Sequence, residues 1–134
     1  MNDCLFCKII KGEIPSKTIY EDEIVKVFLD INPSTNGDAL LIPKNHITTI
    51  DEVDEQLMNY LLKMIKKLKP VFEKKLGAQG LTIVQNNGYG QEIKHFHIHL
   101  TPRYENDLVE HKYNNALLLP LEEIEKKLTI QENI

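Results

Sequence analysis

The order of strand-like and helix-like segments predicts an α+β domain, in which a mostly antiparallel sheet of about five strands packs against one long helix. Short apolar runs bounded by turn residues fill residues 17–43. An apolar period of three to four residues, typical of an amphipathic helix, then runs from 54 to 76. Two further strand-like runs follow, at 80–85 and 95–99. The 134 residues are enough for one domain with its own core.

The elements before the long helix are expected to be short. Residues 3–11 predict a helix of about two turns that ends at Gly12. Residues 17–21 and 24–30 predict two strands joined by a turn. The apolar run Ala39–Ile42 is short enough to be a buried strand.

The long helix is predicted to have one apolar face, with lysines on the opposite, solvated face. The apolar positions are Leu57, Tyr60, Leu61, Met64, Ile65, Leu68 and Phe72. Pro70 is expected to kink or interrupt the last turns of this helix. Beyond the last strand-like run, Pro120 is expected to open a helix that continues to Leu128.

Composition and charge exclude several classes of protein. A net charge of -4 and a pI near 5.7 argue against a protein that coats nucleic acid, because such a protein usually carries a basic face. No apolar run approaches the ~20 residues that span a bilayer, and the first residues do not resemble a secretory signal. We therefore expect a cytoplasmic protein with neither a nucleic acid nor a membrane as partner.

Three histidines, His95, His97 and His99, alternate with apolar residues. In a strand, side chains at this spacing share one face, whereas a helix would scatter them around its axis. The pattern predicts a strand with an apolar underside and a surface of three imidazoles. The preceding residues, 86–91, are rich in Asn and Gly and predict a loop folded back over that surface.

The two cysteines, Cys4 and Cys7, form a Cys-x-x-Cys pair. In a reducing compartment such a pair is more often a metal or redox site than a structural disulfide. His46 follows one predicted strand and His95 begins another, so the two could complete a four-ligand zinc site if those strands are close. A redox pair and two small apolar side chains on a helix remain alternatives at this point.

The remaining pair, His97 and His99, indicates chemistry at phosphorus. A histidine whose pKa stays near neutrality can act as a nucleophile, an acid or a base, and a phosphorylated imidazole divides one displacement into two. Donors are needed for the phosphate oxygens, and Asn86 and the backbone at Gly88 and Gly90 could supply them. The sequence contains no P-loop motif.

The segment from His95 to Thr101 fits the His-x-His-x-His-x-x signature and resembles the histidine triad (HIT) superfamily. The resemblance extends roughly from Cys4 to Arg103 and is greatest to the small bacterial and Hint-like branches, some of which carry the same Cys-x-x-Cys pair. Further landmarks occur in the family's order: Phe6–Ile10, Glu13–Pro15, Glu21-Asp22, Leu29–Pro33, Leu41–His46 and Gly90-Gln91.

This resemblance implies catalytic and phosphate-binding roles for individual residues. His97 would attack the α-phosphorus of a nucleotide, and His99 would contact the phosphate and assist the leaving group. Asn86 and the Gly90-Gln91 pair would hold the phosphate or orient the nucleophile.

The resemblance also implies how the rest of the nucleotide and a metal are held. Asp30 would accept hydrogen bonds from the ribose hydroxyls. The base would be sandwiched by Phe6, Ile9, Phe28 and Ile31. In the branch with the cysteine pair, a structural zinc ion would be bound by Cys4, Cys7, His46 and His95.

At the level of the whole chain, the resemblance implies a HIT domain over residues 1–106. The family is typically a homodimer with the long helix and the next strand at the interface, and we expect the sheet to continue across it. Residues 107–134 match no family landmark, and we expect this C-terminal extension to pack on the dimer or to be swapped across it.

Two departures from the family pattern concern the phosphate site. Only Tyr89 separates the Asn87-Gly88 and Gly90-Gln91 pairs, where the family usually has a longer loop. Glu92 stands where relatives often carry Ser or Thr. A carboxylate there would repel phosphate unless it points away or is paired.

Three functions are compatible with these residues. The first is an enzyme that cleaves purine nucleoside phosphoramidates or dinucleoside polyphosphates through a nucleotidyl-histidine intermediate, with hydrolysis or transfer as the second step. The second is a zinc-dependent phosphoesterase in which His95, His97 and His99 all bind one catalytic metal. The third is a nucleotide-binding module without turnover.

Overall fold

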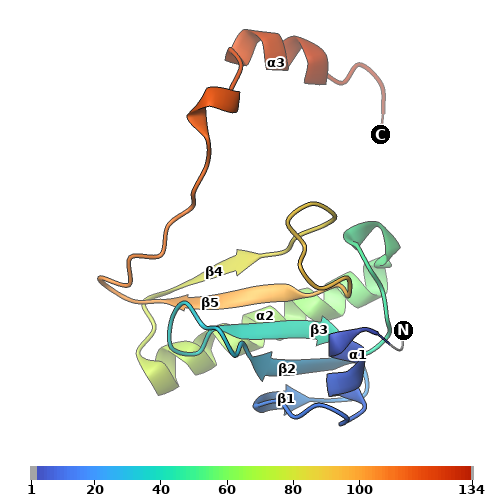
Figure 1. Ribbon diagram of the computed structural model, residues 1–134, viewed down its shortest axis with the longest axis vertical. Helices are drawn as coiled ribbons and strands as arrows, with labels where there is room; N and C mark the ends of the chain where they lie inside the picture. The colour runs from blue at the N-terminus through green and yellow to red at the C-terminus, as the bar shows by residue number, and fades with distance from the viewer. Residues whose placement is uncertain (1–2, 134) are drawn as a thin grey trace.

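The sheet of this protein has five strands, all antiparallel to their neighbours, as seen in a computed structural model that describes residues 3–133. Their spatial order is β1-β2-β3-β5-β4 (Figure 1). The strands are β1 (Thr18–Glu21), β2 (Val25–Leu29), β3 (Ala39–Pro43), β4 (Gly80–Val84) and β5 (Ile98–Arg103). The predicted α+β class and the antiparallel five-stranded sheet are confirmed.

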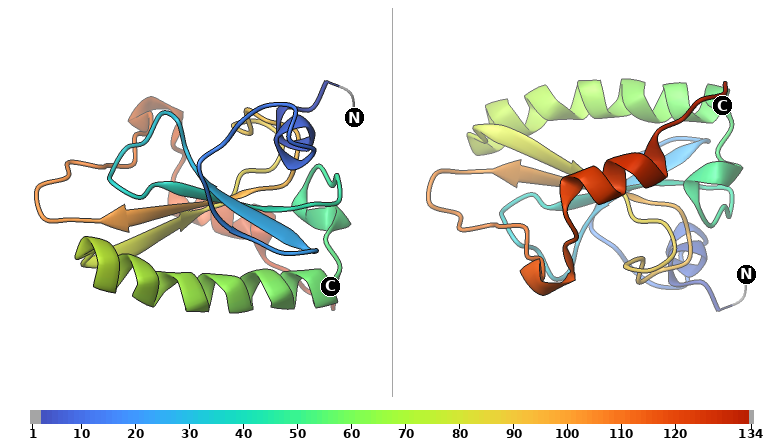
Figure 2. Two further views of the ribbon diagram at one scale, coloured as in Figure 1. Left: turned by 90° about the horizontal axis from the view of Figure 1, so that it is seen from below. Right: turned by 90° about the horizontal axis from the view of Figure 1, so that it is seen from above.

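Two helices lie on opposite faces of the sheet (Figure 2). The long helix α2 (Glu55–Leu76) buries its apolar stripe against one face, where Leu41 of β3 contributes to the core. The short helix α1 (Leu5–Ile10) covers part of the other face, where Leu40 and Ile42 belong to a second apolar cluster. Successive strand residues point to opposite faces of the sheet, and a helix covers each face here. Strand β3 is therefore apolar along its whole length.

Helix α2 has the ends that its sequence predicted. Asp54 caps the N-terminus by accepting a hydrogen bond from the Leu57 backbone N–H, and Gly77 ends the helix with φ of 70°, a left-handed conformation that favours glycine. The expected interruption at Pro70 does not occur. Pro70 lies on the exposed face, where water can solvate the Lys66 carbonyl that has lost its helical donor.

The histidine segment differs from its prediction in one respect, because β5 begins at Ile98 rather than at His95. The Phe96 N–H donates to the Ile47 carbonyl at 2.6 Å instead of joining the sheet. The predicted alternation nevertheless holds. Phe96 and Ile98 are buried in the α2-side core, and the intervening His97 lies with α1 on the opposite face, where its ring contacts Phe6.

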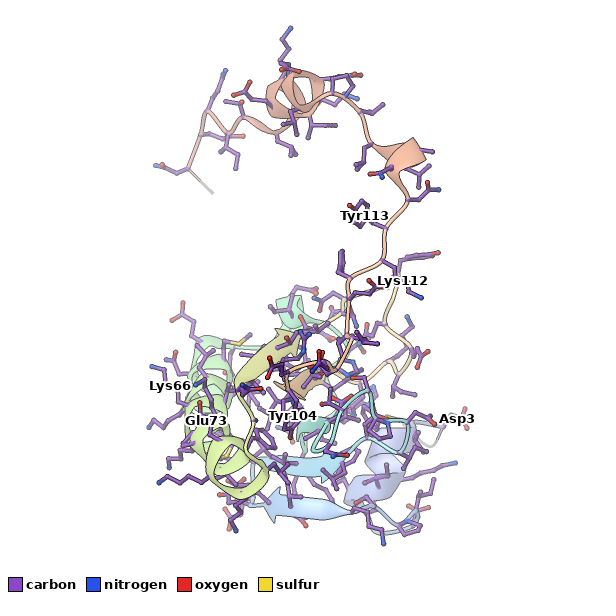
Figure 3. All side chains as sticks on the ribbon, turned by 90° about the vertical axis from the view of Figure 1, so that its left-hand side faces the viewer. Asp3, Lys66, Glu73, Tyr104, Lys112 and Tyr113 are labelled. Atoms are coloured by element: carbon purple, nitrogen blue, oxygen red, sulfur yellow. The ribbon has the colours of Figure 1, made fainter. Side chains whose placement is uncertain are left out.

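The C-terminal extension leaves the end of β5 and projects away from the sheet (Figure 1). It contains a 3-10 turn (Asn115–Leu117) and helix α3 (Leu121–Leu128), which follows Pro120 as predicted; another 3-10 turn (Ile50–Glu52) precedes α2. Figure 3 shows Lys112 and Tyr113 on this projecting arm. Within residues 3–133, no helix is both long enough and apolar enough to cross a membrane.

Candidate functional site

Four potential metal ligands from three parts of the chain meet at the N-terminal end of α1. The donor atoms of Cys4, Cys7, His46 and His95 all lie within 4.8 Å of one another. Cys7 Sγ is 3.3 Å from His46 Nδ1 and 3.6 Å from His95 Nδ1, and Cys4 Sγ is 3.5 Å from His95 Nδ1. These are the four residues that the sequence singled out for zinc.

The chemistry and spacing of this cluster fit a tetrahedral zinc ion. With ordinary Zn–S and Zn–N bond lengths, a sulfur and a nitrogen ligand lie about 3.6 Å apart, close to the separations found here. His95 donates its Nε2–H to the Pro43 carbonyl at 2.8 Å, so its Nδ1 holds the lone pair that faces the sulfurs. Burial and the neighbouring Cys4 raise the pKa of the Cys7 thiol, and a bound divalent cation would oppose both effects.

The central histidine of the triad is held in one tautomer. His97 Nδ1 lies 2.7 Å from the His95 carbonyl, which can only accept, so Nδ1 carries the proton and Nε2 carries the lone pair. Burial lowers the pKa of His97, which favours the neutral ring, while the charges of Asp30 and Glu92 partly oppose this effect. Phe6 packs edge-on against the His97 ring with centroids 5.1 Å apart and helps to fix its orientation.

His97 and His99 line a cavity of about 420 Å³ beside α1. Their ring centroids are 4.9 Å apart. The other sequence-predicted residues that line this cavity are Phe6, Ile9, Phe28, Asp30, Ile31, Asn86 and Gly90. A second cavity, of about 480 Å³, lies beside the start of α2 and contains none of these side chains.

Gln91 and Gly88 are the residues predicted for the phosphate site that do not line this cavity. The Gln91 side chain is buried, donating from Nε2 to the Thr48 carbonyl at 2.8 Å and accepting at Oε1 from the Gly88 N–H at 3.1 Å. Asn87 adds a second link by accepting from the Ile50 N–H at 2.7 Å. The structure therefore shows Gln91 fastening the 86–91 loop to the segment that follows His46.

Glu92 lines the cavity, and its side chain is exposed at the rim. Within residues 3–133 no ion pair involves it. The nearby Lys94 donates instead to the carbonyls of Gly88 and Gln91, at 3.2 and 2.8 Å. Of the two conditions that would remove a carboxylate from a phosphate site, pairing is not met among the described residues.

Sequence reasoning missed some apolar residues of the cavity, among them Ile14, Leu40 and Ile93. Leu40 could have been found from strand alternation, because it neighbours the core residue Leu41 and must face the other side of the sheet. Ile14 and Ile93 lie in irregular segments and carry no comparable signal.

Comparisons with known proteins agree with this geometry. A protein-family model described as the HIT domain matches residues 11–106. An uncharacterized HIT-like protein of Methanocaldococcus jannaschii is 48% identical, and the match covers 93% of this chain and 98% of the relative. An adenosine 5'-monophosphoramidase of Schizosaccharomyces pombe is 36% identical, over 75% of this chain and 74% of that protein.

A solved structure bears on the cysteine–histidine cluster. The crystal structure of a zinc-bound histidine triad family protein from Mycobacterium smegmatis is similar to this chain, with 30% identity and a TM-score of 0.77. The match covers 85% of this chain and 84% of that one. With a family match over most of its length and a relative nearly half identical, this chain belongs to the HIT domain family.

Proposed function

We propose that this protein is a nucleotide hydrolase or nucleotidyl transferase, which cleaves at the α-phosphate of a purine nucleoside phosphoramidate or a dinucleoside polyphosphate. The observation that carries the proposal is the geometry of His97. Its Nδ1–H is bound by a backbone carbonyl, which leaves the Nε2 lone pair free on a ring that lines a cavity of nucleotide-like size. The similarity to a monophosphoramidase supports the choice of phosphoramidates.

In the first step, the Nε2 lone pair of His97 forms a bond to the α-phosphorus. The bond from phosphorus to the amine or phosphate leaving group breaks, and the leaving group departs with that electron pair. An amine leaving group also takes up a proton, which the solvent supplies. His99, which lines the same cavity beside His97, would hydrogen-bond the phosphate and the leaving group. The Asn86 side chain and the Gly90 backbone supply neutral donors for the non-bridging oxygens.

In the second step, an acceptor oxygen attacks the phosphorus of the nucleotidyl-His97 intermediate. Water as the acceptor releases a nucleoside monophosphate, whereas another nucleophile gives a transferase product. The P–N bond to His97 breaks and the neutral imidazole is restored.

The remainder of the cavity suits a nucleoside. The aromatic and aliphatic side chains of Phe6, Ile9 and Phe28 offer an apolar surface to a purine, with Ile31 at the rim. One carboxylate oxygen of Asp30 accepts from the Asn32 N–H at 2.9 Å, and the other is available to the ribose hydroxyls.

The cysteine–histidine cluster would hold a structural zinc ion, which cross-links α1 to the segments that carry His46 and His95. This arrangement argues against a catalytic zinc bound by the whole triad. The lone pair of His95 faces the sulfurs, and His97 Nδ1 is already committed to a carbonyl. By analogy with the family we also propose a cytoplasmic homodimer.

The proposal is tested by intact-protein mass spectrometry, without acid in the quench, after brief mixing with an adenosine phosphoramidate. We expect a nucleotidyl adduct on the wild type and none on His97→Ala, which should lose turnover by at least about a thousandfold while keeping its zinc content. His111→Ala, at an exposed histidine of the arm, is the matched control and should behave as wild type. Retained turnover in His97→Ala would overturn the assignment of the nucleophile.

A further inference from the structure

The cavity that contains His97 combines a phosphate site with an unusual set of charges. Its described lining residues include two carboxylates, Asp30 and Glu92, and no lysine or arginine. The donors proposed for the phosphate are the Asn86 side chain, the Gly90 backbone and His99. A bound nucleotide therefore adds its negative charge to a site that is already acidic, and each further phosphate on the leaving group increases the repulsion.

His97 and Glu92 lie at different depths in the cavity, and this difference indicates the direction in which the leaving group extends. His97 is almost fully buried at the floor of the cavity, whereas the Glu92 side chain is exposed at its rim. In an in-line displacement the leaving group lies opposite the attacking Nε2, so it extends from the floor towards the rim. Glu92 is the exposed acidic residue that lines the cavity on this outer side.

No side chain of the described residues forms an ion pair with the Glu92 carboxylate. The neighbouring Lys94 is held by two loop carbonyls. A cation on the leaving group would gain a carboxylate partner at this position. A polyphosphate would meet a like charge.

Building on the proposed function, we propose that Glu92 selects the leaving group, favouring nucleoside phosphoramidates whose amine carries a second, cationic group over dinucleoside polyphosphates. The bonds formed and broken are those of the proposed reaction. The amine nitrogen departs with the electron pair of the P–N bond and takes up a proton from solvent. The distant ammonium group stays charged throughout and pairs with Glu92.

The experiment compares kcat/KM for three adenosine substrates: an N-(4-aminobutyl) phosphoramidate, its uncharged N-pentyl analogue, and a diadenosine polyphosphate. We expect the wild type to prefer the aminobutyl to the pentyl compound by about three- to tenfold at low salt, as a single charge pair near a protein surface would give. This preference should shrink as the ionic strength rises.

Glu92→Gln should abolish the preference for the ammonium group and improve the polyphosphate relative to the pentyl compound by a similar factor. Glu92→Lys should reverse both preferences, which separates a charge effect from a general loss of activity. Glu105→Gln is the matched control, since Glu105 is exposed and lies outside this cavity. It should keep the wild-type ratios.

The outcomes separate this inference from the function on which it rests. Turnover of all three substrates with ratios unchanged in Glu92→Gln and Glu92→Lys would overturn the role of Glu92 and leave the proposed function intact. A wild type that turns over none of them, and forms no adduct, would overturn both.

Discussion

His95 and His97 differ in the ring nitrogen that donates a hydrogen bond to a backbone carbonyl. His95 donates from Nε2 to Pro43 and so presents Nδ1 to the cysteines, whereas His97 donates from Nδ1 to His95 and so keeps Nε2 free. These different tautomers suit the roles proposed for the two rings, a metal ligand at His95 and a nucleophile at His97. The difference between the two rings lies in which nitrogen carries the proton, as well as in where each ring lies.

Asp22, in the turn between β1 and β2, connects this turn to α2 through hydrogen bonds. Asp22 accepts hydrogen bonds from the side chains of Tyr20 and Tyr60 and from two backbone N–H groups of its own turn. Burial raises the pKa of Asp22, but the hydrogen bonds from Tyr60 and from the Val25 and Ile24 N–H groups outweigh burial and lower the pKa to about 2.

This shift predicts acid sensitivity. Because the folded-state pKa lies below the unfolded value of about 3.9, the contribution of Asp22 is complete above pH 4 to 5 and is lost as the pH falls towards 2. We expect Asp22→Asn to cost about 1–2 kcal/mol of unfolding free energy at neutral pH and to make stability less dependent on pH between 4 and 2. Urea denaturation across that range measures both effects.

Glu23→Gln is the control for Asp22→Asn, because Glu23 is the exposed neighbour in the same turn. It should leave the stability and its pH profile within about 0.5 kcal/mol of wild type. A parallel fall of wild type and Asp22→Asn below pH 4 would contradict the assignment.

Among the helices and strands, the ends that could be predicted from the sequence are those set by interactions between residues close together in the chain. The limits of α2 were predictable because Asp54 and Gly77 act within one turn of the helix ends. The start of β5 could not be predicted. The alternation of histidine and apolar residues begins at His95, but the Phe96 N–H donates to the Ile47 carbonyl, a distant residue, and so does not join the sheet. Likewise, nothing near Gln91 in the sequence reveals its bond to Thr48, although half of the cavity lining could be named in advance.

Helix α1 is the element that the proposed zinc ion would hold most directly, because Cys4 caps it and Cys7 lies within it. It has only six residues, too few to be stable alone, and its residues Phe6 and Ile9 line the cavity. Cys7 →Ser, or removal of zinc by a chelator, should therefore lower the Tm by several degrees and weaken nucleoside monophosphate binding about tenfold. Calorimetry, metal analysis and binding titration measure the three quantities.

The matched control is Lys11→Ser, at the exposed end of the same helix, which should retain its metal and its affinity. Loss of the metal with unchanged Tm and unchanged nucleotide affinity would show that the ion does not organise α1.

At the scale of the whole molecule, two features are left incomplete in the single chain. Strand β4 is an edge of the sheet, and its residues Ile83 and Val84 are about half exposed. The arm beyond β5 carries exposed apolar side chains: Leu117, Leu118, Leu119, Leu121, Leu128 and Ile130. Sequence could predict α3 from Pro120 and its spacing, but not its docking place, because α3 lies away from the sheet and none of its residues is buried (Figure 1).

These apolar side chains predict burial against a second copy of the chain, either packed on the dimer or swapped across it. Leu118 and Leu121 are 67% and 82% exposed in the single chain, and burying each such side chain is worth about 1.5–3 kcal/mol. We expect the full chain to sediment as a dimer and the double variant Leu118→Glu/Leu121→Glu to weaken the dimer at least tenfold without changing the circular dichroism of the sheet.

Lys112→Glu, on the same arm, controls for added negative charge and should keep the wild-type dissociation constant (Figure 3). A wild-type monomer at micromolar concentration, or equal dissociation constants for the double variant and wild type, would show that the arm does not join two copies.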